Sequence, residues 1–162
     1  MAVNAFVQFS NDTKGESKQK GYEGWIEIQG WDWEIEAESS WTKGGGASVG
    51  KALPGKLNFE HYFDKASPAI MIYICSGKSF DQVKLHMCKT TGKPTPEVYF
   101  TMTMDGIYIT KVSNSGTEEG NVVQKIEMVF KKVAIEYKPQ DDKGALGTAM
   151  KYQWNIPEGS AS

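Results

Sequence analysis

The amino-acid sequence predicts a mainly β fold, a small antiparallel β-barrel of two sheets with one short α-helix. Apolar and polar residues alternate with a period of two along most of the 162-residue chain, as they do in strands with one buried face. Three polar, glycine-containing stretches, 10–21, 42–56 and 139–149, are expected to be loops. The length predicts one domain, 1–157, followed by a flexible C-terminal tail, 158–162.

The alternating segments define the strands. In each segment, side chains of one parity are apolar and most of the others are polar, which is typical of a half-buried antiparallel sheet. Two apolar residues in these segments, Phe130 and Trp154, are assigned to the core. In chain order, the clearest segments are 3–9, 57–63, 83–88, 98–104, 122–130 and 150–156.

Two breaks in the alternation predict irregular strands. After Phe130 the buried face changes parity at Lys131–Lys132, where no turn residue stands. We therefore expect a bulge or bend in one long strand that continues to Tyr137, which we also place in the core. At Asp105–Gly106 the Asp-Gly pair favours a hairpin turn, but strand-like residues continue on both sides. A turn and a bulge are both compatible with that pattern.

The segment 67–76 is apolar on every face, and its residue types alone would suit a buried strand. Its flanks favour a helix, because Ser67 can cap, Pro68 suits the first helical position and Gly77 suits the left-handed position after the last turn. A helix that is apolar all round needs cover on both sides. We expect the sheet to cover one side and something else to cover the other, for which a neighbouring subunit is one option.

The stretch GWIEIQGWDWEIE, 24–36, contains three tryptophans among acidic residues. Ile26 and Ile28 are the expected inward residues before Gly30, whereas Trp31 and Trp33 are the expected inward residues after it, so the parity changes at the glycine. Tryptophans can fill a core or form a platform for sugars or bases, and the regular placement of these two favours the core. The acids of opposite parity then form an outward stripe that faces solvent or an enclosed lumen: Asp32, Glu34 and Glu36.

Composition argues against several functions. The net charge is −2 and all 18 basic residues are lysine, so neither bulk attraction to nucleic acid nor bidentate arginine contacts are expected. No apolar run is long enough to span a membrane. Two cysteines, thirteen residues apart, form neither a metal motif nor a disulfide framework and suit a reducing compartment. The N-terminal residues lack the features of a secretory signal peptide, so we expect synthesis in the cytoplasm.

Motifs with catalytic potential are weak. Gly45, Gly50 and Lys51 fit the spacing of a phosphate-binding loop, but Ala52 replaces the metal-binding hydroxyl and Pro54 prevents a following helix. His86 and Cys88 share a strand face without further zinc ligands. Cys75 lies in an apolar segment and is expected to be a buried, inert thiol. We expect no enzyme activity, no metal and no cofactor.

Six stretches follow one another along nearly the whole chain: GES (15–17), GWIEIQGWDW (24–33), DKASP (64–68), CSGKSF (75–80), VFKKVAIEYKPQ (129–140) and WNI (154–156). Taken together, in this order and at plausible spacings, they resemble the Hcp family, the haemolysin-coregulated proteins of bacterial type VI secretion systems.

The resemblance implies more than the residue patterns do. Family members are small β-barrels with one helix, related in fold to phage tail-tube proteins. They form hexameric rings that stack into a hollow tube, which a contracting sheath drives out of the cell behind a spike protein. Some rings carry small effector proteins in the lumen. The resemblance therefore implies a secreted structural subunit whose partners are itself, the spike, the sheath and small effectors.

The resemblance also implies roles for individual positions. Asp32 matches a position on the channel-lining sheet, where the family often has a small polar residue, and Glu34 and Glu36 are further candidates for that surface. The loop 42–56 matches a long family loop implicated in contacts within and between rings. Its candidate contact residues are Lys43, Gly44, Gly45, Gly46, Val49, Lys51 and Leu53.

Two other classes of function differ in what they predict. A lectin-like monomeric sandwich would use exposed tryptophans, and its fluorescence would shift with added glycan. An enzyme centred on Cys75 would show rapid thiol labelling in the native state, whereas a buried thiol would react slowly.

Overall fold

The computed structural model describes residues 3–11, 13–41, 47–89 and 93–162. Within them the chain is mainly β, with one α-helix, as the sequence predicts. The elements are β1 (Val3–Phe9), β2 (Ile26–Ile28), β3 (Gly30–Asp32), β4 (Ile35–Trp41), β5 (Ala47–Pro54), β6 (Leu57–Tyr62), α1 (Ser67–Ser76), β7 (Phe80–Lys89), β8 (Glu97–Gly116), β9 (Val122–Val129), β10 (Lys132–Tyr137), β11 (Met150–Asn155) and β12 (Ser160–Ala161).

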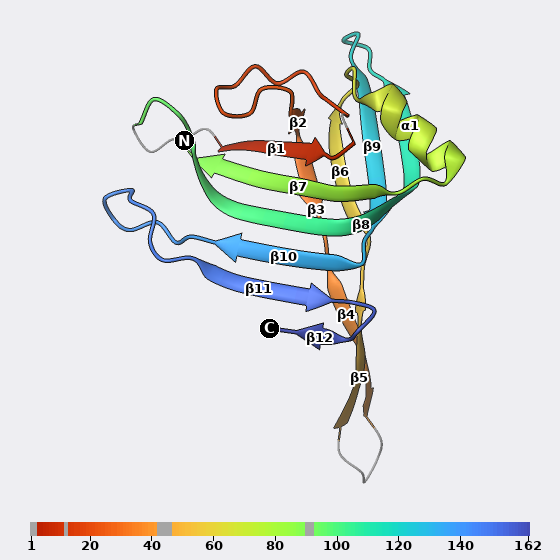
Figure 1. Ribbon diagram of the computed structural model, residues 1–162, viewed down its shortest axis with the longest axis vertical. Helices are drawn as coiled ribbons and strands as arrows, with labels where there is room; N and C mark the ends of the chain where they lie inside the picture. Colours follow the sequence, from red (N-terminus) through yellow and green to blue (C-terminus); the bar gives the residue numbers. More distant parts are fainter. Residues whose placement is uncertain (1–2, 12, 42–46, 90–92) are drawn as a thin grey trace.

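The strands form two main antiparallel sheets that share β8 (Figure 1). Sheet A has the order β12-β11-β10-β8-β7-β1-β2, and sheet B has the order β3-β6-β9-β8. Strands β4 and β5 form a separate hairpin. The predicted barrel is not closed, because no ladder among the described residues joins β2 or β12 to sheet B. The strands instead stack as two layers with their apolar faces together.

The shared strand β8 explains both breaks in the sequence pattern. Its first part pairs with β7 and β10, and its second part, from Tyr108, pairs with β9. Between the two parts, Gly106 has a φ of 65°, so the strand bends there and does not turn back as a hairpin. Opposite this bend, Phe130 and Lys131 separate β9 from β10, and Lys131 N–H donates to Asp105 O at 3.0 Å. The one long predicted strand is therefore two strands, one in each sheet.

The chain also passes from sheet A to sheet B at Gln29. Strand β2 pairs with β1 in sheet A, and β3 pairs with β6 in sheet B. The predicted change of parity at Gln29–Gly30 is thus the place where the chain changes sheets. Ile26 and Ile28 are buried, as expected, on the sheet A side of that crossing.

The core lies between the two sheets. Sheet A contributes residues such as Val7, Leu85, Met102 and Met104, and sheet B contributes Leu57, Phe59, Ile126 and Met128. A smaller apolar cluster lies on the outer side of β1 and β7. There, under the segment 13–25, Phe6 stacks on Tyr22 with 4.4 Å between ring centroids and Cys88 is fully buried beside them.

Four of the five expected core residues lie in the core or pack against it. Phe130 and Trp154 are buried, while Trp31 and Trp33 are partly buried and pack against the core. Tyr137 is a correction, because 43% of its surface is exposed. It lies at the end of β10, opposite Met150, where sheet A extends beyond the cover of sheet B.

The helix α1 begins at Ser67 and ends before Gly77, which has the predicted left-handed φ of 70°. Ser67 is not the cap, because Ala66 holds that position and the Ser67 hydroxyl accepts the Asp64 N–H at 3.1 Å. Ile70 faces the core, whereas Ile72 is 60% exposed and Cys75 is also exposed. Within the described residues, no helix is long and apolar enough to cross a membrane.

Two predicted irregular segments are wrong. Most of the described part of the 42–56 loop is β5, paired with β4 in a hairpin that projects from the body of the molecule (Figure 1). The expected flexible tail, 158–162, turns back along β11 and forms β12, with Gln153 and Ser162 exchanging main-chain hydrogen bonds. The stretch 139–149 is irregular, as predicted, apart from one bridge between Gln140 and Leu146.

Candidate functional site

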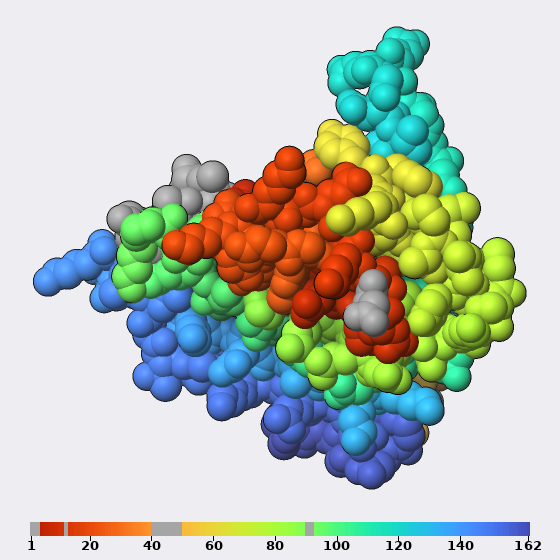
Figure 2. All heavy atoms as spheres, turned by 45° about the horizontal axis from the view of Figure 1, so that its top comes forward, coloured from red at the N-terminus to blue at the C-terminus, as the bar shows by residue number. Residues whose placement is uncertain are grey.

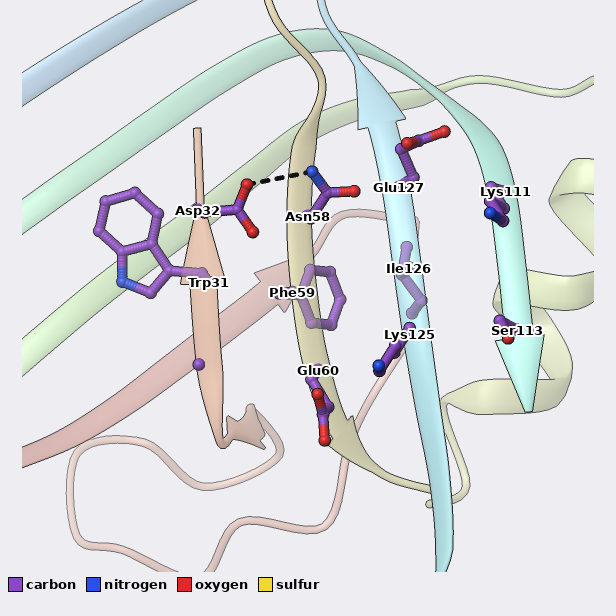
Figure 3. Close-up of a pocket in the computed structure, with 11 residues that line it drawn as sticks. Trp31, Asp32, Asn58, Phe59, Glu60, Lys111, Ser113, Lys125, Ile126 and Glu127 are labelled. Carbon is purple, nitrogen blue, oxygen red and sulfur yellow. Dashed lines mark hydrogen bonds between the residues drawn. The ribbon is translucent and has the colours of Figure 1, made fainter. Parts of the chain in front are cut away.

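The outward surface of sheet B brings together charged and amide side chains from four strands, β3, β6, β9 and β8. On β6, Leu57, Phe59 and His61 are buried, so Asn58 and Glu60 point outward. The same alternation on β9 buries Ile126 and Met128 and turns Lys125 and Glu127 outward. We define the polar face of sheet B by six residues, namely Asp32, Asn58, Glu60, Lys111, Lys125 and Glu127 (Figure 3).

Strand register sets these side chains in two rows. The first row runs Asp32, Asn58, Glu127, Lys111 across β3, β6, β9 and β8, and the second runs Gly30, Glu60, Lys125, Ser113. In both rows an acid lies toward β3 and a lysine toward β8. The polar face is therefore not uniformly acidic, and the expected outward stripe of acids is supplemented by lysines from strands distant in sequence.

A shallow, open concavity of about 520 Å³ lies over these rows. The second row is bounded by small residues, because Gly30 has no side chain and Ser113 has a short one. Trp31 borders the concavity from the side of β3 (Figure 3). Such an open surface suits contact with a macromolecule better than enclosure of a small substrate.

Two members of the polar face, Asp32 and Glu127, accept side-chain hydrogen bonds. Asn58 Nδ2 donates to Asp32 Oδ2 at 3.2 Å (Figure 3). Glu127 accepts from Lys56 Nζ at 3.2 Å and from Thr110 Oγ1 at 3.3 Å. These contacts are largely exposed to solvent, so they orient the groups more than they stabilise the fold.

The two tryptophans beneath this surface are held by the core. Trp31 stacks on Phe100 with 5.3 Å between ring centroids, and its Nε1–H donates to Met87 Sδ at 3.2 Å. Trp33 packs on Phe130, and its Nε1–H donates to Gly55 O at 3.1 Å. The indoles therefore anchor the chain between β3 and β4, and they do not form an exposed stacking platform.

The three acids of the predicted stripe do not lie together. Asp32 is on the polar face and lines the concavity. Glu34 is exposed beyond the end of β3, where its carbonyl accepts the Gly55 N–H at 2.8 Å. Glu36 is exposed on β4, opposite Leu53, and belongs to the projecting hairpin. Neither Glu34 nor Glu36 lines the concavity.

Only three of the seven candidate contact residues of the 42–56 loop lie within the described part of the chain. Lys43, Gly44, Gly45 and Gly46 lie outside the described residues. Val49, Lys51 and Leu53 are on β5. Lys51 is exposed and Leu53 is 50% exposed.

The groups with chemical reactivity do not converge. Cys75 is exposed on α1, so the expectation of a buried thiol is wrong. Cys88 is buried and donates to the Tyr22 hydroxyl, which lies 3.0 Å from His86 Nδ1. Burial raises the pKa of the Cys88 thiol and lowers the pKa of His86. Among the described residues, no cluster of three or more His, Cys, Asp or Glu side chains could hold a metal ion.

Sequence reasoning predicted only Asp32 among the six residues of the polar face and missed the other five, namely Asn58, Glu60, Lys111, Lys125 and Glu127. Their outward parity is visible in the alternation of their strands. What the alternation cannot give is the order β3-β6-β9-β8, which places Asn58 opposite Glu127 and Glu60 opposite Lys125, far along the chain. The exposure of Ile72 and Cys75 was likewise not predictable, because the sequence of an all-apolar helix does not show which side faces outward.

The fold and the polar face together define a two-sheet β protein with an open polar surface on one sheet. Comparison with known proteins identifies its family. Residues 6–137 match the family model described as "Type VI secretion system effector, Hcp". The chain is 35% identical over 158 residues to "Protein hcp1" of Pseudomonas aeruginosa, and this alignment covers 96% of each chain.

Solved structures agree with that match. The structure described as "crystal structure of Hcp1 from Salmonella typhimurium" is 29% identical, with a TM-score of 0.82 and full coverage of both chains. "Structure of a type six secretion system protein" shares the fold at 23% identity, with a TM-score of 0.90 over 99% of this chain and 100% of that one. The chain belongs to the Hcp family of type VI secretion proteins.

Proposed function

We propose that this protein is the inner-tube subunit of a type VI secretion system, forms hexameric rings that stack into a hollow tube, and carries small effector proteins in the lumen. Family membership over residues 6–137 is the observation that carries this proposal. Members of the family are structural secretion proteins, and an open polar surface without convergent reactive groups suits that role.

Features of the isolated chain support assembly with further copies. Among the residues that the structure describes, sheet B ends in two edge strands without a further strand partner, β3 and the second part of β8. Open edges favour pairing with another chain unless they are covered. Beside β8, the exposed face of α1 carries Ile72 and Cys75. A closed ring would cover such surfaces without leaving a free end.

In this proposal the polar face of sheet B lines the lumen. Its acids and lysines offer contacts to cargo without a strong net charge, so the face can release cargo as well as hold it. The projecting β4–β5 hairpin contacts the adjacent ring, and the exposed Leu53 is covered there. The spike and the sheath are the other partners.

Secretion tests the proposal directly. The tagged protein is expressed in its native host, in a strain with a working type VI machine and in one that lacks the sheath. We expect the protein in the medium of the first strain and only inside the cells of the second. A cytoplasmic marker measured in both media controls for lysis. Equal release from both strains would contradict a role as a sheath-driven tube subunit.

A further inference from the structure

The segment 13–25, here called the strap, lies between β1 and β2 in the chain and covers the outer side of sheet A (Figure 1). Its main-chain hydrogen bonds join strap residues to one another. Gly15 N–H donates to Gly24 O at 2.8 Å, and Ser17 N–H donates to Trp25 O at 2.9 Å. Because these bonds fold the strap without tying it to a strand, side chains must supply its attachment to the sheet.

Tyr22 makes the central contact between the strap and the sheet. Only 5% of its surface is exposed, and its ring stacks on Phe6 of β1 with 4.4 Å between centroids. Trp25 meets the Tyr22 ring edge-on at 4.9 Å and lies 4.8 Å from the His86 ring of β7, again between centroids. This packing removes the Tyr22 hydroxyl from water, so the hydroxyl needs partners within the protein.

The Tyr22 hydroxyl finds two partners on the outer face of β7. Cys88 Sγ donates to Tyr22 Oη at 3.2 Å, and Tyr22 Oη lies 3.0 Å from His86 Nδ1. Because the thiol supplies one proton to the oxygen, the hydroxyl proton is free to bond to Nδ1, which accepts it only in the neutral ring. Burial raises the pKa of Tyr22 and of Cys88, so both keep their protons. The three groups therefore form a chain that runs from thiol to hydroxyl to imidazole.

Among the described residues, those that contact His86 or pair with it carry no negative charge. Its register partners are Phe6 on β1 and Thr101 on β8, and the strap presents two aromatic rings to it. Burial lowers the pKa of His86, and the positive charge of Lys84, two residues earlier on β7, lowers it further. A proton on this ring is therefore not compensated while the strap is closed.

We propose that the chain of Cys88, Tyr22 and His86 is an acid-sensitive clamp that holds the strap on sheet A. At neutral pH each donor in the chain meets an acceptor. When His86 gains a proton, Nδ1 becomes a donor, so two donors meet the Tyr22 oxygen and the hydroxyl proton is left with the weakly accepting Cys88 sulfur. The strap then opens and uncovers Phe6 and Cys88. The clamp goes beyond a role in secretion, because it makes the exposure of an apolar surface depend on pH.

The direction of the pH dependence follows from the hydration of the His86 ring. With the strap open, the ring is in water and has its ordinary pKa of 6.5, whereas the closed strap lowers that pKa. The open form therefore binds the proton first as the pH falls. The contribution of His86 to closure is complete above about pH 6.5 and is lost as the pH falls through the lowered value.

Thiol labelling of the full-length protein tests the clamp, with Cys75→Ser as the parent so that Cys88 is the only thiol. Labelling by dithiodipyridine, which reacts with thiols in mild acid as well as at neutral pH, is timed at about pH 7.5 and about pH 5.5. The urea-unfolded parent gives the intrinsic rate at each pH. We expect the protection of Cys88 to fall several-fold at the lower pH. The limit is about ten-fold, because the lower pH lies about one unit below the ordinary histidine value.

Two variants of this parent separate the members of the clamp. His86→Asn keeps an acceptor near the position of Nδ1 and cannot be protonated in this range, so its protection should be the same at both pH values. Tyr22→Phe keeps the ring that stacks on Phe6 and removes the hydroxyl that joins Cys88 to His86. Its Cys88 should react faster than that of the parent already at the higher pH.

Three results would overturn the proposal: protection of the parent that does not change with pH, a persistent pH dependence in His86→Asn, or unchanged protection in Tyr22→Phe. If His86→Asn does not fold, Lys84→Gln provides a second test, because it removes the charge that repels the protonated ring from the surface of β7. Lys84→Gln should lose less protection at the lower pH than the parent does. An equal or larger loss would refute the clamp.

Discussion

At the scale of single residues, two positions carry the chain from one sheet to the other. Gln29 separates β2 from β3, and its N–H donates to Glu60 O at 2.7 Å. Gly106 bends β8 with a φ of 65° and lies against Lys131. Each position shows in the sequence as a break in alternation with a glycine, which is Gly30, next to Gln29, in the first case and Gly106 itself in the second. The sequence predicted an irregularity at both positions. The choice between a turn and a bend at Gly106 depended on which strands pair with β8, and the sequence does not show that.

The bend at Gly106 gives the first prediction. Gly106→Ala would place a Cβ in a left-handed conformation and 3.1 Å from Lys131 Cδ. We expect a loss of roughly 1–2 kcal/mol in the free energy of unfolding, since that conformation is costly for residues with a side chain. Urea unfolding measures it. Gly116→Ala is the control, because its Cβ would meet no atom within 4 Å. Equal effects of the two changes would contradict the assigned role of Gly106.

A second prediction concerns Asp32. Because Asp32 is exposed on the polar face, Asp32→Lys should leave the fold and the native mass unchanged, and it should alter which small proteins co-purify with the rings from the native host. Glu36→Lys makes the same change of charge on the hairpin, away from the concavity, and should leave the co-purifying set unchanged. Loss of the rings in Asp32→Lys would place this residue in a subunit interface instead.

At the scale of elements, alternation predicted most strands, because each has one face on the core. It failed for the β4–β5 hairpin, where the side chains whose burial is described, 35–39 and 50–54, are exposed apart from the partly buried Ala52. It also failed for β12, where pairing with β11 orders residues that show no apolar alternation. Pro68 and Gly77 predicted the helix. The cap was assigned to Ser67, but the Ser67 hydroxyl accepts the Asp64 N–H and Ala66 holds the cap position.

The projecting hairpin gives a third prediction. Ala37 and Ala52 are directly paired, so residues 38–51 can be replaced by an Asn-Gly turn without disturbing the pairs nearer the body. An isolated two-stranded hairpin is only marginally stable, so its removal should change the melting temperature by no more than a few degrees. Electron microscopy should show that rings still form but stacks become rare.

Two outcomes would contradict that account of the hairpin. Failure of the shortened chain to fold would make the hairpin part of the core structure. Normal stacking would remove it from the contact between rings. Leu53→Ser keeps the hairpin and removes an exposed apolar side chain that the shortened chain retains, so it tests the contact of Leu53 separately from the loss of residues 38–51.

At the scale of the whole molecule, the isolated chain leaves several surfaces uncovered. The space-filling view shows the segment 117–121 projecting from the body, with α1 on the surface below it (Figure 2). Ile72 on α1, Tyr137 on β10 and Met150 on β11 are all large apolar side chains with more than 40% of their surface exposed. Monomeric proteins usually avoid such combinations with open sheet edges, so further copies of the chain are the expected cover.

The native mass of the purified protein tests this account most directly. Light scattering on a sizing column gives it without reference to shape. We predict about six times the 18.0 kDa mass of one chain, because a closed ring of six covers the open edges of sheet B and the outer face of α1. A monomer that stays monomeric at high protein concentration would contradict the ring.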